Sequence, residues 1–107
     1  MPTTLGNLFS DIPDASPEEI FEKLHEQPGI TIERILSNGQ ATAEGKWYDQ
    51  DFDEWVLLVQ GKGQLLFEDG TEQTLNTGDY LFIPQHQRHR VVRTEKSTIW
   101  LAIYIKD

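Results

Sequence analysis

Histidines and carboxylates are the residues of this chain that could bind a metal ion or move a proton. The 107 residues include no cysteine, which excludes a thiolate nucleophile and any metal site built on sulfur. Two of the three histidines, His86 and His89, fall within four residues of each other. A metal site would therefore use histidine, carboxylate or amide ligands. The segment 86–89 is the best candidate to supply the histidines.

Glu54 is the carboxylate with the most informative surroundings. Residues two apart on a strand point to the same face, so Gln50 and Glu54 share a face with Val56 and Leu58 if one strand runs through them. Glu54 would then enter an apolar interior. An unpaired carboxylate is costly there, so it needs a cation or a protonated histidine as its partner.

The elements that must position these side chains are short strands. Turn signals such as Asn38-Gly39 and Asp69-Gly70 separate apolar segments at regular spacing, which is typical of an all-β sandwich or barrel. The segments 54–60 and 99–105 are apolar on both faces and should be covered on both sides. The expected strands are 30–36, 41–48, 54–60, 64–67, 71–75, 80–83, 89–94 and 99–105.

One short helix is predicted at residues 16–27, before the strands. Ser16 suits an N-cap, Pro17 suits the first helical position, and Glu19 completes a Ser-x-x-Glu capping box, with Pro28-Gly29 as the stop signal. Residues 1–15 form an arm with little pattern. A chain of this length favours one domain, 1–107, with the arm and helix in 1–29 and the barrel in 30–107.

Two segments resemble the motifs of the cupin superfamily, which are small jelly-roll β-barrels. Glu54 precedes Gly61 by seven positions, as the first motif requires, although Tyr48 and Gln50 stand where that motif has two histidines. The second motif matches at its first glycine, Gly78, and at Pro84 and His89. His86 stands where that motif has its second glycine.

The resemblance covers roughly residues 45–93 and implies a cupin barrel with a mononuclear divalent metal site, holding Fe, Mn, Ni or Zn. His89 occupies the position that the family uses opposite Glu54. The candidate ligands are Gln50, Glu54, His86 and His89. The alternative is a hydrogen bond between Glu54 and His89 with no metal.

Three further residues are candidates for the wall of a pocket. Arg93 shares the strand parity of His89, so it is expected to face the interior, where it could hold a carboxylate or phosphate or pair with an acid. Tyr48 and Tyr104 could line the same pocket and offer their hydroxyls as proton donors, or could be core residues.

The charge of the chain limits its partners. The net charge is -9, and residues 1–53 hold 11 acids and 3 bases, against 7 acids and 6 bases in residues 54–107. Such an acidic chain is repelled by phosphate backbones, which disfavours nucleic acid. The basic run 86–93 still allows a small anionic ligand. No segment has the length of a membrane helix or the pattern of an export signal, so we expect a cytoplasmic protein without a membrane partner.

These observations predict a small cupin barrel that binds or acts on a small organic molecule. As an enzyme it would be a metal-dependent dioxygenase, isomerase or lyase; the alternatives are a non-catalytic binding barrel and a structural dimer without metal. A small barrel has one interior, and Trp55 and Trp100 lie in strands apolar on both faces. We therefore expect a homodimer that buries one sheet, as the resemblance to small cupins also implies.

Overall fold

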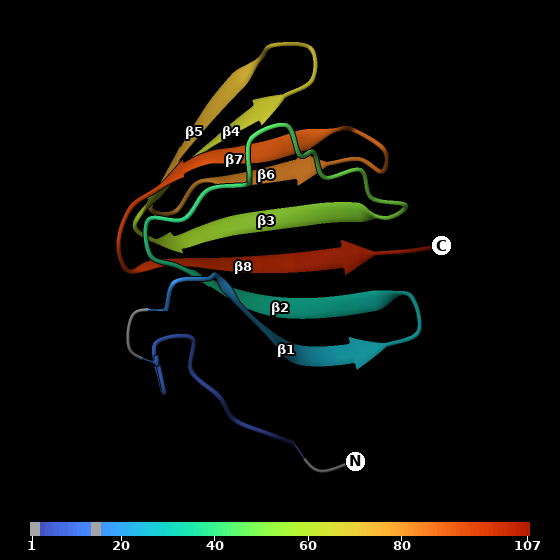
Figure 1. Ribbon diagram of the computed structural model, residues 1–107. Coiled ribbons are helices and arrows are strands. Elements are labelled where there is room, and N and C mark those ends of the chain that lie inside the picture. Colours follow the sequence, from blue (N-terminus) through green and yellow to red (C-terminus); the bar gives the residue numbers. More distant parts are fainter. Residues whose placement is uncertain (1–2, 14–15) are drawn as a thin grey trace.

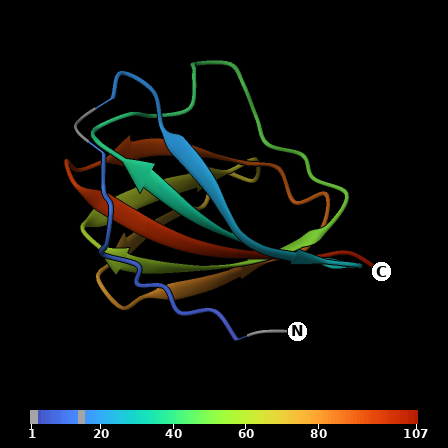
Figure 2. The same cartoon turned by 90° about the horizontal axis from the view of Figure 1, so that it is seen from below.

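In the residues that the computed structural model describes, 3–13 and 16–107, the chain forms eight strands in two facing antiparallel sheets (Figure 1). The five-stranded sheet has the order β1-β2-β8-β3-β6, and the three-stranded sheet has the order β5-β4-β7. Figure 2 shows the two layers from below. The strands are β1 (Ile20–Gln27), β2 (Ile30–Ser37), β3 (Asp53–Gln60), β4 (Lys62–Phe67), β5 (Glu72–Asn76), β6 (Tyr80–Ile83), β7 (His89–Thr94) and β8 (Thr98–Ile105).

The all-β prediction is confirmed, whereas the predicted helix at residues 16–27 is wrong. Most of that segment is β1, which pairs antiparallel with β2 through a two-residue turn at Pro28-Gly29. Gly29 has a φ of 81°, a left-handed conformation that favours glycine, and a Cβ there would lie 2.8 Å from the carbonyl oxygen of Lys106. The Pro-Gly pair therefore closes a hairpin, and the edge of β2 offers β1 more backbone hydrogen bonds than an isolated helical turn would.

The predicted strand 41–48 is also wrong. A turn at Glu44-Gly45 interrupts it, with the Lys46 amide donating to the Ala43 carbonyl oxygen at 3.0 Å. The segment instead follows β7 and contacts it at separate points. Tyr48 forms an isolated bridge with His89, and the Thr42 amide donates to the carbonyl oxygen of Val91 at 2.8 Å.

The core lies between the two sheets and follows the period-two pattern of the strands. On β3, Val56 and Leu58 point inward and are buried, and Trp55 and Leu57 point to the outer face, where they are half-buried. The core cluster comprises Ile35, Val56, Leu58, Leu65, Phe67, Leu75, Ile83, Trp100 and Ala102. No helix with the length and hydropathy of a membrane span occurs in the described part of the chain.

Gly63 on β4 makes room for the indole of Trp100. A Cβ at position 63 would lie 2.4 Å from Cη2 and from Cζ2 of Trp100, so the ring would have to move. We expect Gly63→Ala to lower the free energy of unfolding by about 1–3 kcal/mol, as overpacking of a core does. Urea denaturation checks this. Gly6→Ala is the control, because a Cβ at Gly6 meets nothing within 4 Å; equal stabilities of the two variants would contradict the expectation.

Candidate functional site

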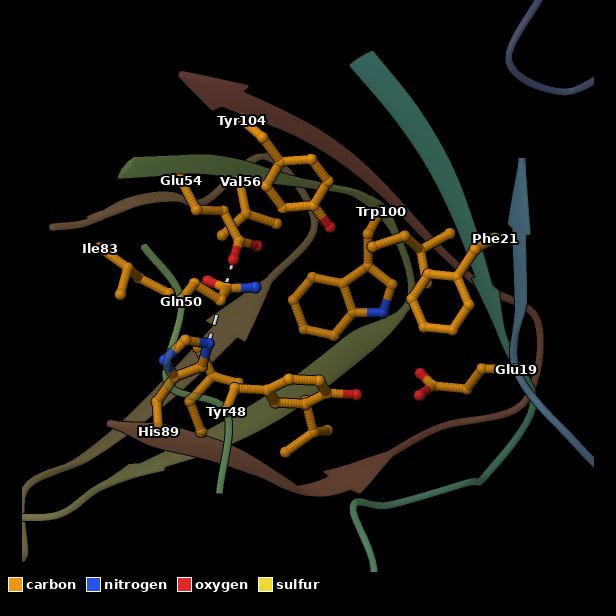
Figure 3. A pocket seen from close by; sticks show the side chains of 13 residues that line it. Glu19, Phe21, Tyr48, Gln50, Glu54, Val56, Ile83, His89, Trp100 and Tyr104 are labelled. Atoms are coloured by element: carbon orange, nitrogen blue, oxygen red, sulfur yellow. Dashed lines mark ion pairs between the residues drawn. The ribbon is translucent and has the colours of Figure 1, made fainter. Parts of the chain in front are cut away.

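Glu54 lies on β3 with its carboxylate directed between the sheets. It pairs with Ile83 of β6 and with Tyr104 of β8, so both neighbouring strands surround it. Only 7% of the residue is exposed. Figure 3 shows its carboxylate directed toward the imidazole of His89 across the cavity. The inward direction predicted for this residue from strand parity agrees with its place in the fold.

His89 begins β7 on the opposite sheet and is 4% exposed. Its Nδ1 lies 2.9 Å from the carbonyl oxygen of Gln87, and a carbonyl oxygen can only accept, so Nδ1 carries the proton. The lone pair of the neutral ring is then on Nε2. That atom lies 3.9 Å from Oε1 of Glu54, which is too far for a direct hydrogen bond but close enough to share a small group between them.

The surroundings favour the neutral forms of both residues. Burial raises the pKa of Glu54 to about 7, with a further contribution from the charge of Glu33, while a hydrogen bond from Gln50 acts in the opposite direction. Burial lowers the pKa of His89, against the effect of the Gln87 carbonyl. The pair is thus a carboxyl group near its midpoint at neutral pH beside an uncharged imidazole, and not a strong ion pair.

Gln50, Tyr48 and Tyr104 lie around this pair and line the same cavity. The Tyr48 ring stacks on His89 with ring centres 5.6 Å apart, and the two residues exchange backbone hydrogen bonds of 2.7 and 3.1 Å. Burial and the charge of Glu54 raise the pKa of both tyrosines, with Glu19 adding to the shift at Tyr48. Both phenols therefore stay protonated and can donate hydrogen bonds.

A cavity of about 70 Å³ lies between the sheets and has mostly apolar walls. Its buried end holds Glu54 and His89, and its open end holds Glu19, Phe21 and Tyr48 (Figure 3). The complete lining is Glu19, Phe21, Ile35, Tyr48, Gln50, Glu54, Val56, Leu65, Ile83, His89, Val91, Trp100 and Tyr104.

His86 does not join the other predicted metal ligands. It lies in the turn after Pro84 with a φ of 64°, its side chain is 64% exposed, and its Nδ1 lies 2.9 Å from Oδ1 of Asp49. The three-residue spacing from His89 places it on the loop and not on the strand, so it is absent from the cavity lining.

Arg93 faces solvent, which is opposite to the direction expected from its parity. Gln64 of β4 pairs with Arg93 and the next residue, Leu65, pairs with Val91, so β7 contains a bulge around Val92. The extra residue reverses the alternation, and Thr94 takes the inward position. Arg88 and Arg90 lie over the ring of Trp47, and Arg88 also pairs with Glu68. None of the three lines the cavity.

The donors that reach the cavity do not fit the metal site expected from the sequence. Those at the buried end are one imidazole, one carboxylate and one amide, from His89, Glu54 and Gln50, and the second carboxylate, that of Glu19, lies at the open end. Non-haem sites for divalent first-row metals typically use two histidines and one carboxylate. In the described residues, no group of three or more His, Cys, Asp or Glu side chains could hold a metal ion. No chemical step is therefore assigned to a metal.

Glu19 and Trp100 are lining residues that the sequence analysis does not place in a pocket. The sequence pattern assigns Glu19 to a helix cap and places Trp100 in a strand that is apolar on both faces. In the structure the indole Nε1 of Trp100 donates to Oγ of Ser37 at 3.1 Å, and the Ser37 hydroxyl donates to the carboxylate of Glu19. No local pattern signals this contact, because it depends on the pairing of β1 with β2 and of β2 with β8.

Comparisons with known proteins identify the family and two similar proteins. The cupin domain pattern matches residues 35–104. An uncharacterized protein of Aquifex aeolicus (strain VF5) is 33% identical over 92 residues, covering 85% of this chain and 73% of that protein. A crystal structure from Ralstonia eutropha JMP134, provisionally named a mannose-6-phosphate isomerase, is 44% identical with a TM-score of 0.93, covering 98% of this chain and 100% of that one.

A third protein extends the likeness at the level of the fold. A cupin superfamily protein of Desulfitobacterium hafniense DCB-2 is 17% identical with a TM-score of 0.80, and the match covers 100% of this chain and 95% of that chain. The two facing sheets, the Glu54 and His89 positions and the match over residues 35–104 lead to the same conclusion. The chain belongs to the cupin family.

Proposed function

We propose that this cupin binds a small organic molecule in the cavity between its sheets and moves a proton on that molecule with Glu54 and His89. One observation carries the proposal. The two side chains face each other at the buried end of the cavity, with Nε2 of His89 3.9 Å from Oε1 of Glu54. The raised pKa of Glu54, about 7, leaves its carboxyl group about half protonated at neutral pH, and the lowered pKa of His89 leaves its ring uncharged. One group can donate a proton while the other accepts one, as general acid–base catalysis requires.

The proton transfers balance for a substrate with a carbonyl group. Nε2 of His89 takes a proton from the carbon next to the carbonyl, and the protonated carboxyl of Glu54 gives its proton to the carbonyl oxygen, so an enol forms. In a substrate with a hydroxyl on that carbon, the protonated His89 returns its proton to the former carbonyl carbon while the carboxylate of Glu54 takes the proton of the hydroxyl, which gives the isomeric carbonyl compound. In a substrate with a leaving group on the next carbon, that group departs with the proton of His89 while the carboxylate of Glu54 takes back the enol proton, which gives the elimination product. The phenols of Tyr48 and Tyr104 line the same cavity and can donate hydrogen bonds to the substrate.

This geometry supports an isomerase or a lyase more than a dioxygenase. A non-haem iron dioxygenase uses a facial triad of two histidines and one carboxylate, and the described cavity lining contains one histidine. The provisional name of the Ralstonia eutropha protein is that of a sugar isomerase, which agrees with the reaction type. A sugar phosphate does not suit this cavity equally well, because no Lys or Arg side chain is part of its described lining.

Exchange of carbon-bound protons with deuterium tests the proposal without knowledge of the true substrate. We would incubate a panel of small aldehydes, ketones and sugars with the protein in D₂O and follow the signal of the proton next to the carbonyl by NMR. At least one compound is expected to exchange faster with the wild type, and His89→Gln should remove that increase. Binding of panel members without exchange would contradict the catalytic proposal and favour the non-catalytic alternative.

We also propose that the outer face of the five-stranded sheet joins two copies of this chain. An apolar patch, the outer patch, lies on β3, β6 and β8, and its aromatic residues Tyr80 and Phe82 are 67% and 52% exposed. It is continuous, since Trp55 pairs with Phe82 on one side and with Ile103 on the other. The outer patch consists of Trp55, Leu57, Tyr80, Phe82, Leu101 and Ile103.

A second copy is the partner that this surface suits best. The outer patch contains no charged residue, whereas the chain as a whole carries a net charge of -9, so contact through the patch avoids bringing like charges together. We expect wild-type protein to have a dimer mass by light scattering at micromolar concentration and Phe82→Glu to be monomeric. Leu24→Glu is the control, at a 49% exposed position on β1. A monomeric wild type, or a dimeric Phe82→Glu, would contradict this.

A further inference from the structure

The charged groups that line the cavity are all of one sign. Glu54 lies at its buried end and Glu19 at its open end, and no Lys or Arg is part of the described lining. His89 adds no positive charge, because burial lowers its pKa. An anionic ligand would therefore meet no positively charged side chain in the described lining, so the cavity does not support the anionic ligand expected from the basic run 86–93.

Glu19 is held in place at the open end by neutral partners. Ser37 donates to one oxygen of its carboxylate, and Trp100 donates to Ser37, so the carboxylate has a fixed orientation. In the described residues Glu19 has no ion pair with a Lys, Arg or His side chain. Figure 3 shows its carboxylate and the hydroxyl of Tyr48 directed toward each other across the cavity.

Aromatic rings stand beside this carboxylate. Phe21 lies next to Glu19 on the approach to the cavity, Trp100 forms the adjacent wall, and Tyr48 lies opposite (Figure 3). The face of an aromatic ring attracts a cation, and the attraction is stronger where water is excluded. A carboxylate beside several rings is therefore a recognition surface for an organic cation, whereas Glu54 at the far end is surrounded by core side chains.

We propose that the ligand of this cupin carries a small organic cation, a protonated or methylated amine, and that Glu19 binds it together with Phe21, Tyr48 and Trp100. This rests on the proposed function only in placing the other end of the ligand near Glu54 and His89. Glu19 at the open end then determines which ligands bind, and Glu54 and His89 at the buried end transfer the proton.

Three probes of nearly the same shape and different charge test this inference. They are choline, 3,3-dimethylbutan-1-ol and 3,3-dimethylbutanoate, which carry one positive charge, none and one negative charge. Dissociation constants are measured by NMR chemical-shift titration of the ¹⁵N-labelled protein. We expect choline to bind about tenfold more tightly than the neutral alcohol, and the anion to bind most weakly.

Glu19→Gln separates the charge from the shape of the site. Glutamine keeps an oxygen that can accept from Ser37, so we expect the fold to be retained and the preference for choline over the alcohol to fall to less than about threefold. Glu18→Gln is the matched control, because this neighbouring residue is exposed, does not line the cavity and removes the same charge. It should keep the preference.

Two results would overturn the inference. One is choline binding that is undetectable or no tighter than binding of the alcohol; the other is a preference for choline that survives in Glu19→Gln. Failure of the proposed function is recognised separately, since it concerns proton exchange and its dependence on His89. A cavity that prefers choline but exchanges no carbon-bound proton would support the ligand class and contradict the catalytic proposal.

Discussion

Glu54→Gln is expected to lower the rate of proton exchange by at least about 100-fold and, at the same time, to stabilise the fold at alkaline pH. The loss of exchange follows because glutamine cannot give up or take a proton, and general acid–base groups commonly contribute factors of 10²–10⁴. The gain in stability follows because glutamine remains neutral in a place where a charged carboxylate is poorly solvated. Exchange by NMR and urea denaturation measure the two effects.

The pH dependence of the stability gain has a definite sign. Burial raises the pKa of Glu54 from 4.5 to about 7 on folding, so between these values the unfolded chain loses its proton before the folded chain does. The carboxyl group therefore costs nothing below pH 4.5 and destabilises the fold increasingly as the pH rises toward 7. We expect Glu54→Gln to match the wild type near pH 4 and to exceed it by about 3 kcal/mol above pH 8.

Glu72→Gln controls for the change of charge, because this exposed residue on β5 lies outside the cavity. It should alter neither the exchange rate nor the pH dependence of unfolding. If Glu54→Gln were less stable than the wild type at pH 8, the carboxylate would be stabilised in the folded protein, and the proposed role of a neutral Glu54 as proton donor would be wrong.

The second large effect is expected at Arg34, which connects the N-terminal arm to the sheet. The residue is 4% exposed, and its guanidinium lies 2.7 and 2.9 Å from the two carboxylate oxygens of Glu22. The same group donates to the carbonyl oxygens of Leu8 and Ser10, at 3.0 and 2.7 Å. Charge-assisted hydrogen bonds of this kind are among the stronger ones, so the side chain fixes β1, β2 and the arm together.

We expect Arg34→Met to lower the free energy of unfolding by about 2–4 kcal/mol, since it leaves Glu22 and the two carbonyl groups without their donor. Amide hydrogen exchange over residues 3–13 should become fast. Arg93→Met is the matched control, because Arg93 is exposed on β7 and should tolerate the change. Unchanged exchange in the arm of Arg34→Met would show that other contacts hold it.

The parts of the fold that were predicted correctly rest on strong local signals. In the turns at Asn38-Gly39 and Asp69-Gly70 the glycine adopts the left-handed backbone conformation, with φ of 91° at Gly39 and 92° at Gly70. The alternation through Val56 and Leu58 places the inner face of β3 correctly, and with it Glu54. These features depend on a few neighbouring residues, so the sequence is sufficient to find them.

The predictions that were wrong depend on contacts between distant residues. Ser16 and Glu19 have the spacing of a helix cap, but strand pairing with β2 decides the conformation of residues 20–27. Arg93 has the parity of His89, but a bulge at Val92 turns it outward. His86 was expected beside His89 as a metal ligand, but it stands where the second motif has a glycine, and a left-handed turn with a φ of 64° carries its side chain to the surface. Neither a bulge nor a loop path can be read from strand periodicity alone.

A titration of the Glu54 carboxyl group shows whether Glu54 and His89 form a neutral acid–base pair. The ¹³C signal of its side-chain carboxyl can be followed by NMR from pH 4 to pH 9, with Glu54→Gln used to assign it, alongside the ring nitrogens of His89. We expect a midpoint near 7 for Glu54 and an uncharged His89 at neutral pH. A Glu54 midpoint below 5 together with a protonated His89 at pH 7 would reveal an ion pair, and the proposed acid–base pair would then be wrong.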